Sequence, residues 1–310
     1  MVIDMMEIMR HTKGKVEVLD SFAKKCWVNV VSPDEEELGK LMSFKKIPKD
    51  LLVSLTDMDE IPAIEKETGF TFFIIRTPQK KVNGGDLEYS TVPLGVILSD
   101  DCVMTVCYTK NDAVERLKAS KMEFSVASLL PKLMLVSAKL YLTYLKEINK
   151  KIHDTQEDLE KSTKNREIIN LLGLEKSLFY FSTSLKGNGV LIEKLYRNGI
   201  YAKSPENKEI LEDAIDENKQ AIEMTSIYSN ILSGMMNAFG SVISNNLNMV
   251  IKFLTSITII LMIPTLIASI YGMNVGLPLQ GEEGAFVIIM AISLLFSILG
   301  IFVFLKRDMF

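Results

Sequence analysis

Polar side chains recur at helical spacing in the first of two uncharged segments near the carboxyl end of the chain. No residue from Phe253 to Ile270 carries a charge, yet polar residues here and in the preceding turns step by three and four positions. This spacing places them on one face of a helix. The stripe consists of Asn248, Ile251, Thr255, Thr258, Met262, Thr265 and Ser269. Its hydroxyl and amide groups prefer water or a hydrogen-bonding partner to lipid, so the stripe could line an aqueous path.

The stripe admits two interpretations. Membrane helices also use Ser and Thr to pack closely, so these residues could serve helix packing alone. A conduit requires several chains, because two helices cannot enclose an aqueous path. Pro264 fits either interpretation, since neighbouring groups or water can satisfy the carbonyl that it leaves free.

Two segments near the carboxyl end are long and apolar enough to cross a bilayer. Phe253–Ile270 has 12 apolar residues out of 18, whereas Ala285–Leu305 has 18 out of 21, so the second suits a lipid-facing helix. Only 13 residues, Gly272–Gly284, join them. Glu282 and Glu283 in this loop are solvated residues in a single chain, but around an oligomer they would form a negative ring that attracts cations.

The chain start predicts the orientation. MVIDMMEIMRHTKGK has no continuous apolar core and is unlike a signal peptide. We therefore expect the amino-terminal part in the cytoplasm, and two crossings return the carboxyl end there. Lys252 before the first span and Lys306–Arg307 after the second agree, because basic residues collect on the cytoplasmic side. The expected location is the cell membrane, with both termini inside.

Composition argues against several classes of function. The 310 residues carry a net charge of −4, and this mildly acidic balance argues against nucleic-acid binding but is compatible with divalent cations. The three cysteines and two histidines lack metal-ligand spacing. We find no phosphate-binding Gly-x-x-x-x-Gly-Lys-Ser/Thr loop and no nucleophile–base pairing, so we expect neither catalysis nor a cofactor.

Residues 15–110 have the pattern of a mixed α/β domain. β-rich runs lie at 16–19, 27–31, 70–75, 92–98 and 103–106, separated by turn formers. Ser32-Pro33-Asp34-Glu35 is typical of a helix start, with Ser32 as the cap and Glu35 reaching back to it. It predicts a helix over Pro33–Phe44, and another begins near Pro48.

Beyond Asp112 the pattern changes to long helices. Helical stretches are predicted over Phe124–Leu159 and Lys164–Leu195, and Ser204 is the predicted cap of the last helix. No proline occurs from Glu206 to Ile263, so a helix of about 85 Å can run into the first span. A packing seam follows this helix, and near the membrane we expect it to contact copies of the chain. The seam is Met224, Ile227, Ile231, Met235, Phe239 and Val242.

A family resemblance is carried by the end of the first span. Pro264-Thr-Leu-Ile-Ala-Ser-Ile-Tyr-Gly-Met-Asn274 resembles the end of the first membrane helix in the CorA family of divalent-cation transporters, whose signature is Gly-Met-Asn. The motif follows a tyrosine at the end of the first of two carboxyl-terminal spans, and a short loop and a basic tail come after it, which makes the match specific. Trp27-Val-Asn-Val-Val-Ser-Pro-Asp-Glu-Glu-Glu37 is similar to the family's amino-terminal domain.

The resemblance implies a funnel-shaped homopentamer. Each chain would contribute an α/β cytoplasmic domain with αβα layers, long stalk helices and two transmembrane helices, with five first spans lining the pore. The implied domains are 1–123, the α/β domain; 124–203, long cytoplasmic helices; 204–250, the stalk part of the pore helix; 251–271, transmembrane helix 1; 272–284, the extracellular loop; 285–305, transmembrane helix 2; and 306–310, a basic tail.

The resemblance also implies the parts of a pore. Gly272, Met273 and Asn274 would form the outer selectivity filter, because Mg²⁺ gives up its water reluctantly and an amide can hold the hydrated ion through its waters. The matching pore-lining positions are Asn248, Ile251, Leu254, Met262 and Thr265, with Thr258 on the same stripe. Met262 and Leu254 would be hydrophobic constrictions and Asn248 a polar ring at the inner mouth. Whether Leu254 or Thr255 faces the axis stays open.

Acidic residues are implied in regulation. Members of the family close when cytoplasmic Mg²⁺ binds acidic residues between protomers. Asp213 aligns with the family's regulatory aspartate, and Asp216 lies near it in the sequence. The candidate partner of Asp213 from the amino-terminal domain is Asp57 or Asp59. The outer loop departs from the family pattern, because many members carry Met-Pro-Glu-Leu where Val275-Gly-Leu-Pro-Leu-Gln-Gly-Glu-Glu-Gly stands here. Glu282 or Glu283 is the candidate replacement for that acidic ring.

The predicted function is passive, potential-driven influx of Mg²⁺, with Co²⁺ and Ni²⁺ as further candidate ions. Mg²⁺ would be both the transported and the regulatory ion. A Zn²⁺ transporter of the same superfamily is the close alternative. A membrane-anchored scaffold or sensor, in which the stripe only packs helices, is the alternative from a different class.

Overall fold

The computed structural model describes residues 6–12, 15–83, 86–120, 125–161, 165–199, 204–279 and 281–307. The chain divides into two compact units, Met1–Gly234 and Met235–Phe310, and helix α6 (Pro205–Tyr271) begins in the first and ends in the second. Some predicted features lie outside the described residues: the helix start at Phe124, the helix start at Lys164, and residues 308–310 of the predicted tail.

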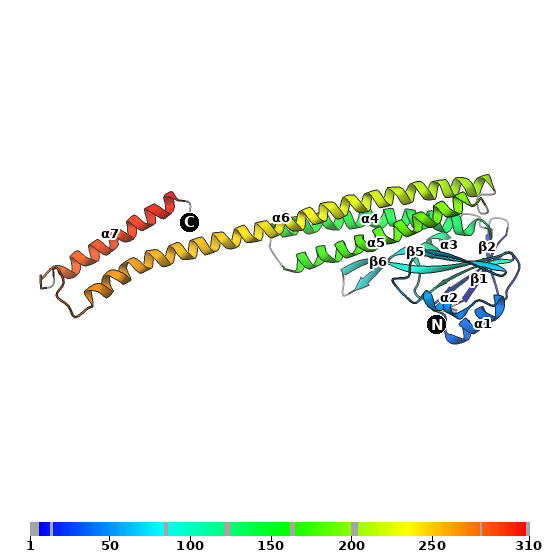
Figure 1. The fold of residues 1–310 in the computed structure, drawn as a ribbon, viewed down its shortest axis with the longest axis horizontal. Coiled ribbons are helices and arrows are strands. Elements are labelled where there is room, and N and C mark those ends of the chain that lie inside the picture. Colours follow the sequence, from blue (N-terminus) through cyan, green and yellow to red (C-terminus); the bar gives the residue numbers. More distant parts are fainter. Residues whose placement is uncertain are drawn as a thin grey trace. The chain divides into compact units, whose positions relative to one another are not determined.

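A seven-stranded mixed sheet forms the centre of the amino-terminal unit (Figure 1). Its strands are β1 (Met6–Thr12), β2 (Lys15–Leu19), β3 (Cys26–Val31), β4 (Ala63–Glu67), β5 (Phe70–Asn83), β6 (Asp86–Ser99) and β7 (Cys102–Cys107). They lie in the order β2-β1-β3-β7-β6-β5-β4, with β3 and β7 parallel and the other neighbours antiparallel. The five predicted runs fall within β2, β3, β5, β6 and β7.

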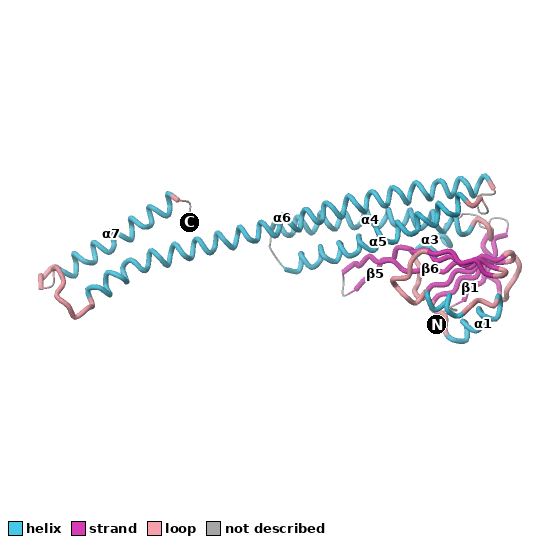
Figure 2. Tube along the Cα trace, viewed as in Figure 1, coloured by secondary structure: helices cyan, strands magenta, loops and turns pink. Residues whose placement is uncertain are grey.

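Helices cover both faces of this sheet (Figure 2). On one face lie α1 (Glu35–Lys45) and α2 (Lys49–Ser54), whose Leu41 and Leu52 join the strand residues Val28 and Phe72 in a buried core. The other face carries α3 (Asp112–Ala119), α4 (Leu129–Lys161) and α5 (Asn165–Arg197). These layers confirm the predicted αβα fold class.

Helix α1 begins two residues later than predicted. Its N-cap is Asp34, whose carboxylate accepts the Glu37 N–H at 2.8 Å, while the Glu37 carboxylate accepts the Asp34 N–H at 3.1 Å. Ser32 instead adopts a left-handed conformation with φ 49° and donates its hydroxyl to the Tyr108 carbonyl at 2.6 Å. Ser32 was the wrong cap because two capping boxes overlap in this segment, and Ser32 is used to join the ends of β3 and β7.

An asparagine side chain from α5 takes the place of a strand beside β5. Strand β4 pairs with β5 only as far as Ala63 opposite Ile74. Two residues further on, the Arg76 N–H donates to Asn188 Oδ1 at 3.0 Å, and Asn188 Nδ2 donates to the Arg76 carbonyl at 2.6 Å. Asn188 is only 6% exposed, so it satisfies buried backbone groups that would otherwise lack partners.

Replacing Asn188 with leucine should lower the free energy of unfolding by about 2 kcal/mol, because it leaves the buried Arg76 N–H without an acceptor. The Arg76 carbonyl keeps the Tyr141 hydroxyl at 3.0 Å. Chemical denaturation of the purified chain measures the change. Asn170→Leu is the matched control, since the Asn170 amide bonds to Glu167 within its own helix. Equal unfolding midpoints for the two variants would contradict this role of Asn188.

The first part of α6 buries one face within its own unit. The Asn207 N–H donates to Ser204 Oγ at 3.1 Å, which confirms Ser204 as the predicted cap. Asn218 donates to the Leu185 carbonyl of α5 at 3.0 Å. The buried residues of this face are Asn207, Leu211, Ala214, Asn218, Ala221 and Thr225. The predicted seam lies off this face, and its Ile227, Ile231 and Val242 are 54%, 46% and 49% exposed in the single chain.

Candidate functional site

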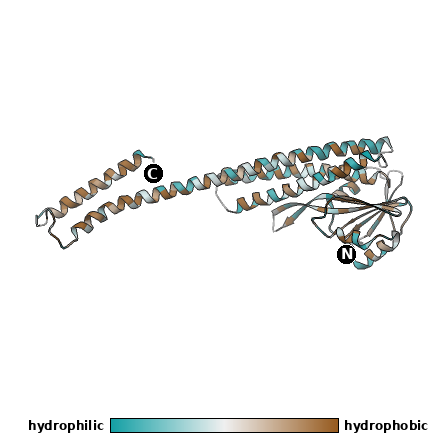
Figure 3. Cartoon of the chain, viewed as in Figure 1, coloured by the Kyte–Doolittle hydropathy of each residue, from teal (hydrophilic) through white to brown (hydrophobic). Residues whose placement is uncertain are grey.

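Two helices of the described chain, α6 and α7 (Ala285–Lys306), are long and apolar enough to cross a membrane. Figure 3 shows hydrophobic residues dominating α7 and the last turns of α6. This agrees with the two predicted spans, since α6 runs without a break through Phe253–Ile270.

Helix α7 packs along one face of α6 through small residues. Ser256 on α6 and Ser293 and Ser297 on α7 are buried. A Cβ added to Gly300 would lie 3.4 Å from Ile263 Cδ1, so the two helices approach closely at this glycine. The half-buried residues on this face of α6 are Ile257, Ile260, Ile263, Pro264 and Ile267. Here serine serves helix packing, as membrane helices commonly use it.

The predicted polar stripe lies on the other side of α6. All seven stripe residues, and Leu254, are exposed in the single chain. At about 100° per residue, the stripe centres roughly opposite the residues that face α7. Contact with α7 therefore does not account for Asn248, Thr258 or Thr265, whereas Ser256 does pack against α7.

The threonine hydroxyls of the stripe are oriented by the helix backbone. Thr258 Oγ1 donates to the Leu254 carbonyl at 2.8 Å, and Thr265 Oγ1 donates to the Leu261 carbonyl at 3.0 Å. Each hydroxyl proton is thus used within the helix, and the oxygen keeps lone pairs as acceptors. Such oxygens suit the waters around a hydrated cation, because those waters donate hydrogen bonds outward.

A tight turn follows the end of α6 at Tyr271. The Gly272 N–H donates to the Ala268 carbonyl at 2.9 Å, and the Met273 N–H donates to the Ile270 carbonyl at 3.2 Å. A Cβ on Gly272 would lie only 3.3 Å from the Ala268 oxygen, which favours glycine there. Gly272, Met273 and Asn274 are all exposed, so the Asn274 amide is accessible at the end of α6.

The two loop glutamates sit at the start of α7. Glu282 and Glu283 are exposed and precede the N-cap Gly284, and the Glu282 carbonyl accepts the Ala285 N–H at 3.0 Å. Carboxylates before a helix start interact favourably with its dipole. A single chain provides this interaction with the helix dipole, whereas a ring of these carboxylates would need several copies of the chain.

The predicted regulatory acids are exposed and lie on two different elements. Asp213 and Asp216 lie on α6, whereas Asp57 and Asp59 lie between α2 and β4, where the Asp57 carboxylate accepts the Asp59 N–H at 2.9 Å. Among the described residues, no three His, Cys, Asp or Glu side chains group closely enough to hold a metal ion. Within one chain, the four predicted acids form no such group.

Comparison with known proteins supplies the family. The model of a family described as CorA-like Mg²⁺ transporter protein matches residues 22–307, which is nearly the whole chain. The chain belongs to this family. CorA proteins are ion transporters and not enzymes, which confirms the functional class that the sequence predicted.

Relatives of the CorA family match along most of their length. The cobalt/magnesium transport protein CorA of Methanocaldococcus jannaschii is 28% identical over 290 residues, covering 90% of this chain and 89% of the relative. The protein of the same name from Thermotoga maritima is 22% identical over 260 residues, covering 80% and 72%. The complete structure of the M. jannaschii CorA magnesium transporter superposes with a TM-score of 0.83 at 25% identity, covering 98% of both chains.

Proposed function

We propose that five copies of the chain assemble with the α6 stripe facing a common water-filled axis, and that Mg²⁺ enters the cell along it. One observation carries this proposal: α7 occupies the opposite face of α6, which leaves the Thr and Asn oxygens uncovered in the single chain. Copies of α6 would supply the remaining walls of the path. The names of the M. jannaschii and T. maritima relatives support Mg²⁺ and Co²⁺ as candidate ions.

Selection is assigned to the turn after α6. A ring of Asn274 amides would accept hydrogen bonds from the waters of Mg²⁺, which exchanges its hydration shell reluctantly. A ring of carboxylates would hold the ion more tightly and slow its release. Glu282 and Glu283 would concentrate cations near this ring through their charge.

Influx needs no chemical fuel. A divalent ion that moves down a potential of ~100 mV gains about 4.6 kcal/mol, twice the value for a single charge. This direction assumes that both termini lie in the cytoplasm, which the basic residues Lys252, Lys306 and Arg307 favour.

Closure is assigned to apolar rings and to acids between copies. Leu254 and Met262, both exposed on α6, would form constrictions that dewet when the helices approach. Internal Mg²⁺ would promote that approach by bridging Asp213 or Asp216 of one copy to Asp57 or Asp59 of the next.

Ion flux into proteoliposomes tests the function. The purified chain should carry Mg²⁺ inward under an inside-negative potential, and a panel of Mg²⁺, Co²⁺, Ni²⁺ and Zn²⁺ gives the preferred ion. Preference for Zn²⁺ would favour the zinc transporter. Absence of flux for every ion would favour the alternative function, a membrane-anchored scaffold or sensor.

The Asp213→Ala variant should need about a tenfold higher internal Mg²⁺ concentration to close, because it loses a carboxylate ligand; this change corresponds to about 1.4 kcal/mol of binding free energy. Flux is measured at graded Mg²⁺ inside the vesicles. Glu209→Ala, an exposed acid one turn away on α6, is the control that should keep the original sensitivity. Identical inhibition of both variants would remove Asp213 from the regulatory site.

A further inference from the structure

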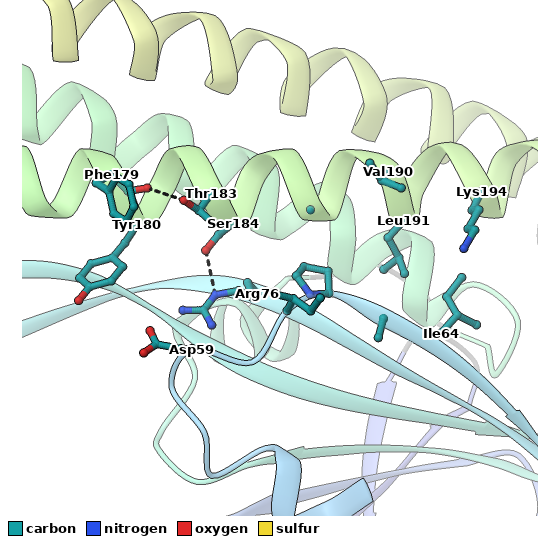
Figure 4. Close-up of a pocket in the computed structure, with 14 residues that line it drawn as sticks. Asp59, Ile64, Arg76, Phe179, Tyr180, Thr183, Ser184, Val190, Leu191 and Lys194 are labelled. Carbon is teal, nitrogen blue, oxygen red and sulfur yellow. Dashed lines mark hydrogen bonds between the residues drawn. The ribbon is translucent and has the colours of Figure 1, made fainter.

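A cavity of about 480 Å³ opens in the amino-terminal unit between α5 and the segment that leads into β4 (Figure 4). Its walls are mostly apolar and include Ile61, Pro62, Ile64, Val190 and Leu191. Pro62 approaches α5 closely, because a Cβ on Gly187 would lie 2.7 Å from the Pro62 Cγ atom. This volume lies within the range of small-molecule sites, which are also mostly apolar.

A buried guanidinium forms the polar part of this cavity. Arg76 is 5% exposed, and no acidic side chain in the described part of the chain forms an ion pair with it. Its hydrogen-bond acceptors are neutral: Ser184 Oγ at 2.9 Å from Nε, Thr91 Oγ1 at 2.6 Å from Nη2, and the Glu60 carbonyl at 2.8 Å from Nη1. A buried charge that is not in direct contact with an opposite charge is costly.

The guanidinium has donor capacity to spare. Nη1 carries two hydrogens, and the Glu60 carbonyl is its one acceptor among the described residues. Burial lowers the pKa of Arg76, an effect opposed by the nearby Tyr141, Asp59 and Asp57. In Figure 4 Ser184 lies above the guanidinium and is joined to it by a hydrogen bond, and Asp59 lies below it.

We propose that this cavity binds a small carboxylate with an apolar body, whose carboxylate accepts from Arg76 while its body packs against Ile64, Val190 and Leu191. The charges that line the cavity are Arg76, Lys194 and Asp59, a net of one positive charge. One net positive charge can neutralise a monoanion. A phosphate with two negative charges would be repelled by Asp59 and only partly neutralised by Arg76 and Lys194. The proposal does not depend on the pore, and the cavity shares only Asp59 with the proposed regulatory site.

Fluorine NMR of a ring-fluorinated 4-phenylbutyrate tests binding to the full chain in nanodiscs. The acid should bind saturably, and 4-phenylbutanol, which lacks the charge, should compete at least tenfold more weakly. Octanoate and unlabelled 4-phenylbutyrate are compared as competitors. Stronger competition by octanoate indicates that the ligand has an acyl chain, and stronger competition by 4-phenylbutyrate indicates that it has an aryl group. Absence of saturable binding, or equal competition by the alcohol, overturns the proposal.

Two variants locate the site. Val190→Trp fills the cavity from a side chain that is 65% exposed, so the fold should tolerate it while binding is lost. Ile169→Trp, also 65% exposed on α5 but outside this cavity, should bind normally. Arg76→Gln should weaken binding at least tenfold, and the Val190→Trp result stands by itself if that variant fails to fold. Normal binding by Val190→Trp would overturn the proposal.

Discussion

The Asn274→Ala variant should lose Mg²⁺ influx almost completely, by about a hundredfold or more, while the oligomer stays intact. Alanine removes the amide at every position of the proposed ring at once, so a hydrated ion would lose several hydrogen bonds in one step, each worth about 1 kcal/mol. The exposed turn should tolerate the change, because the backbone hydrogen bonds from Gly272 and Met273 that shape it do not use the Asn274 side chain. Initial influx of Mg²⁺ into proteoliposomes measures the loss.

Asn246→Ala is the matched control for this prediction. Asn246 is an exposed asparagine of α6 that lies off the polar stripe, so its removal should leave flux within about twofold of the original chain. Size-exclusion chromatography confirms that both variants keep the same oligomer. Flux through Asn274→Ala equal to that of the control would refute the filter assignment, whatever the pore-lining face is.

The sequence predicted the layers of the fold because their signals are local. The runs within β3, β5, β6 and β7 are dense in buried apolar residues, and the long helices lack internal breaks. Strand β4, Ala-Ile-Glu-Lys-Glu, was not predicted because an edge strand can keep charged side chains and therefore lacks the usual pattern. Strand β1 alternates charged and apolar residues near the chain start and is held by pairing with β2, which follows it directly, and with β3, which begins only at Cys26.

Only part of the candidate site could be predicted from the sequence, because the rest depends on contacts between separate elements. The stripe on α6 follows from spacing alone, and its residues are exposed in the single chain. The face that packs on α7 was not predicted, although Ser256 and the small residues Ser293, Ser297 and Gly300 at three- and four-residue spacing were the available signal. The proposed carboxylate partner of Asp213 would lie on another copy of the chain, so the pattern of one sequence does not identify it.

Water access to the stripe gives the second large effect. Thr258→Cys should react with a cationic, membrane-impermeant thiosulfonate at least about a hundredfold faster than Phe296→Cys, because only a thiol in contact with water forms the reactive thiolate. Phe296 on α7 is 53% exposed in the single chain, so it serves as the lipid-facing control. The native Cys26, Cys102 and Cys107 are at most 3% exposed, which keeps background reaction low.

The modified Thr258→Cys pore should also stop conducting. Each attached cationic group adds a positive charge to the narrow path, and like charges in a low-dielectric pore repel a divalent ion strongly. Flux should recover when a reductant removes the group, whereas modification of Phe296→Cys should leave flux unchanged. The scaffold interpretation expects Thr258 to be as protected as Phe296, because a stripe that only packs helices is dry. Equal reaction rates at the two positions would therefore contradict the aqueous axis even if the assembly is pentameric.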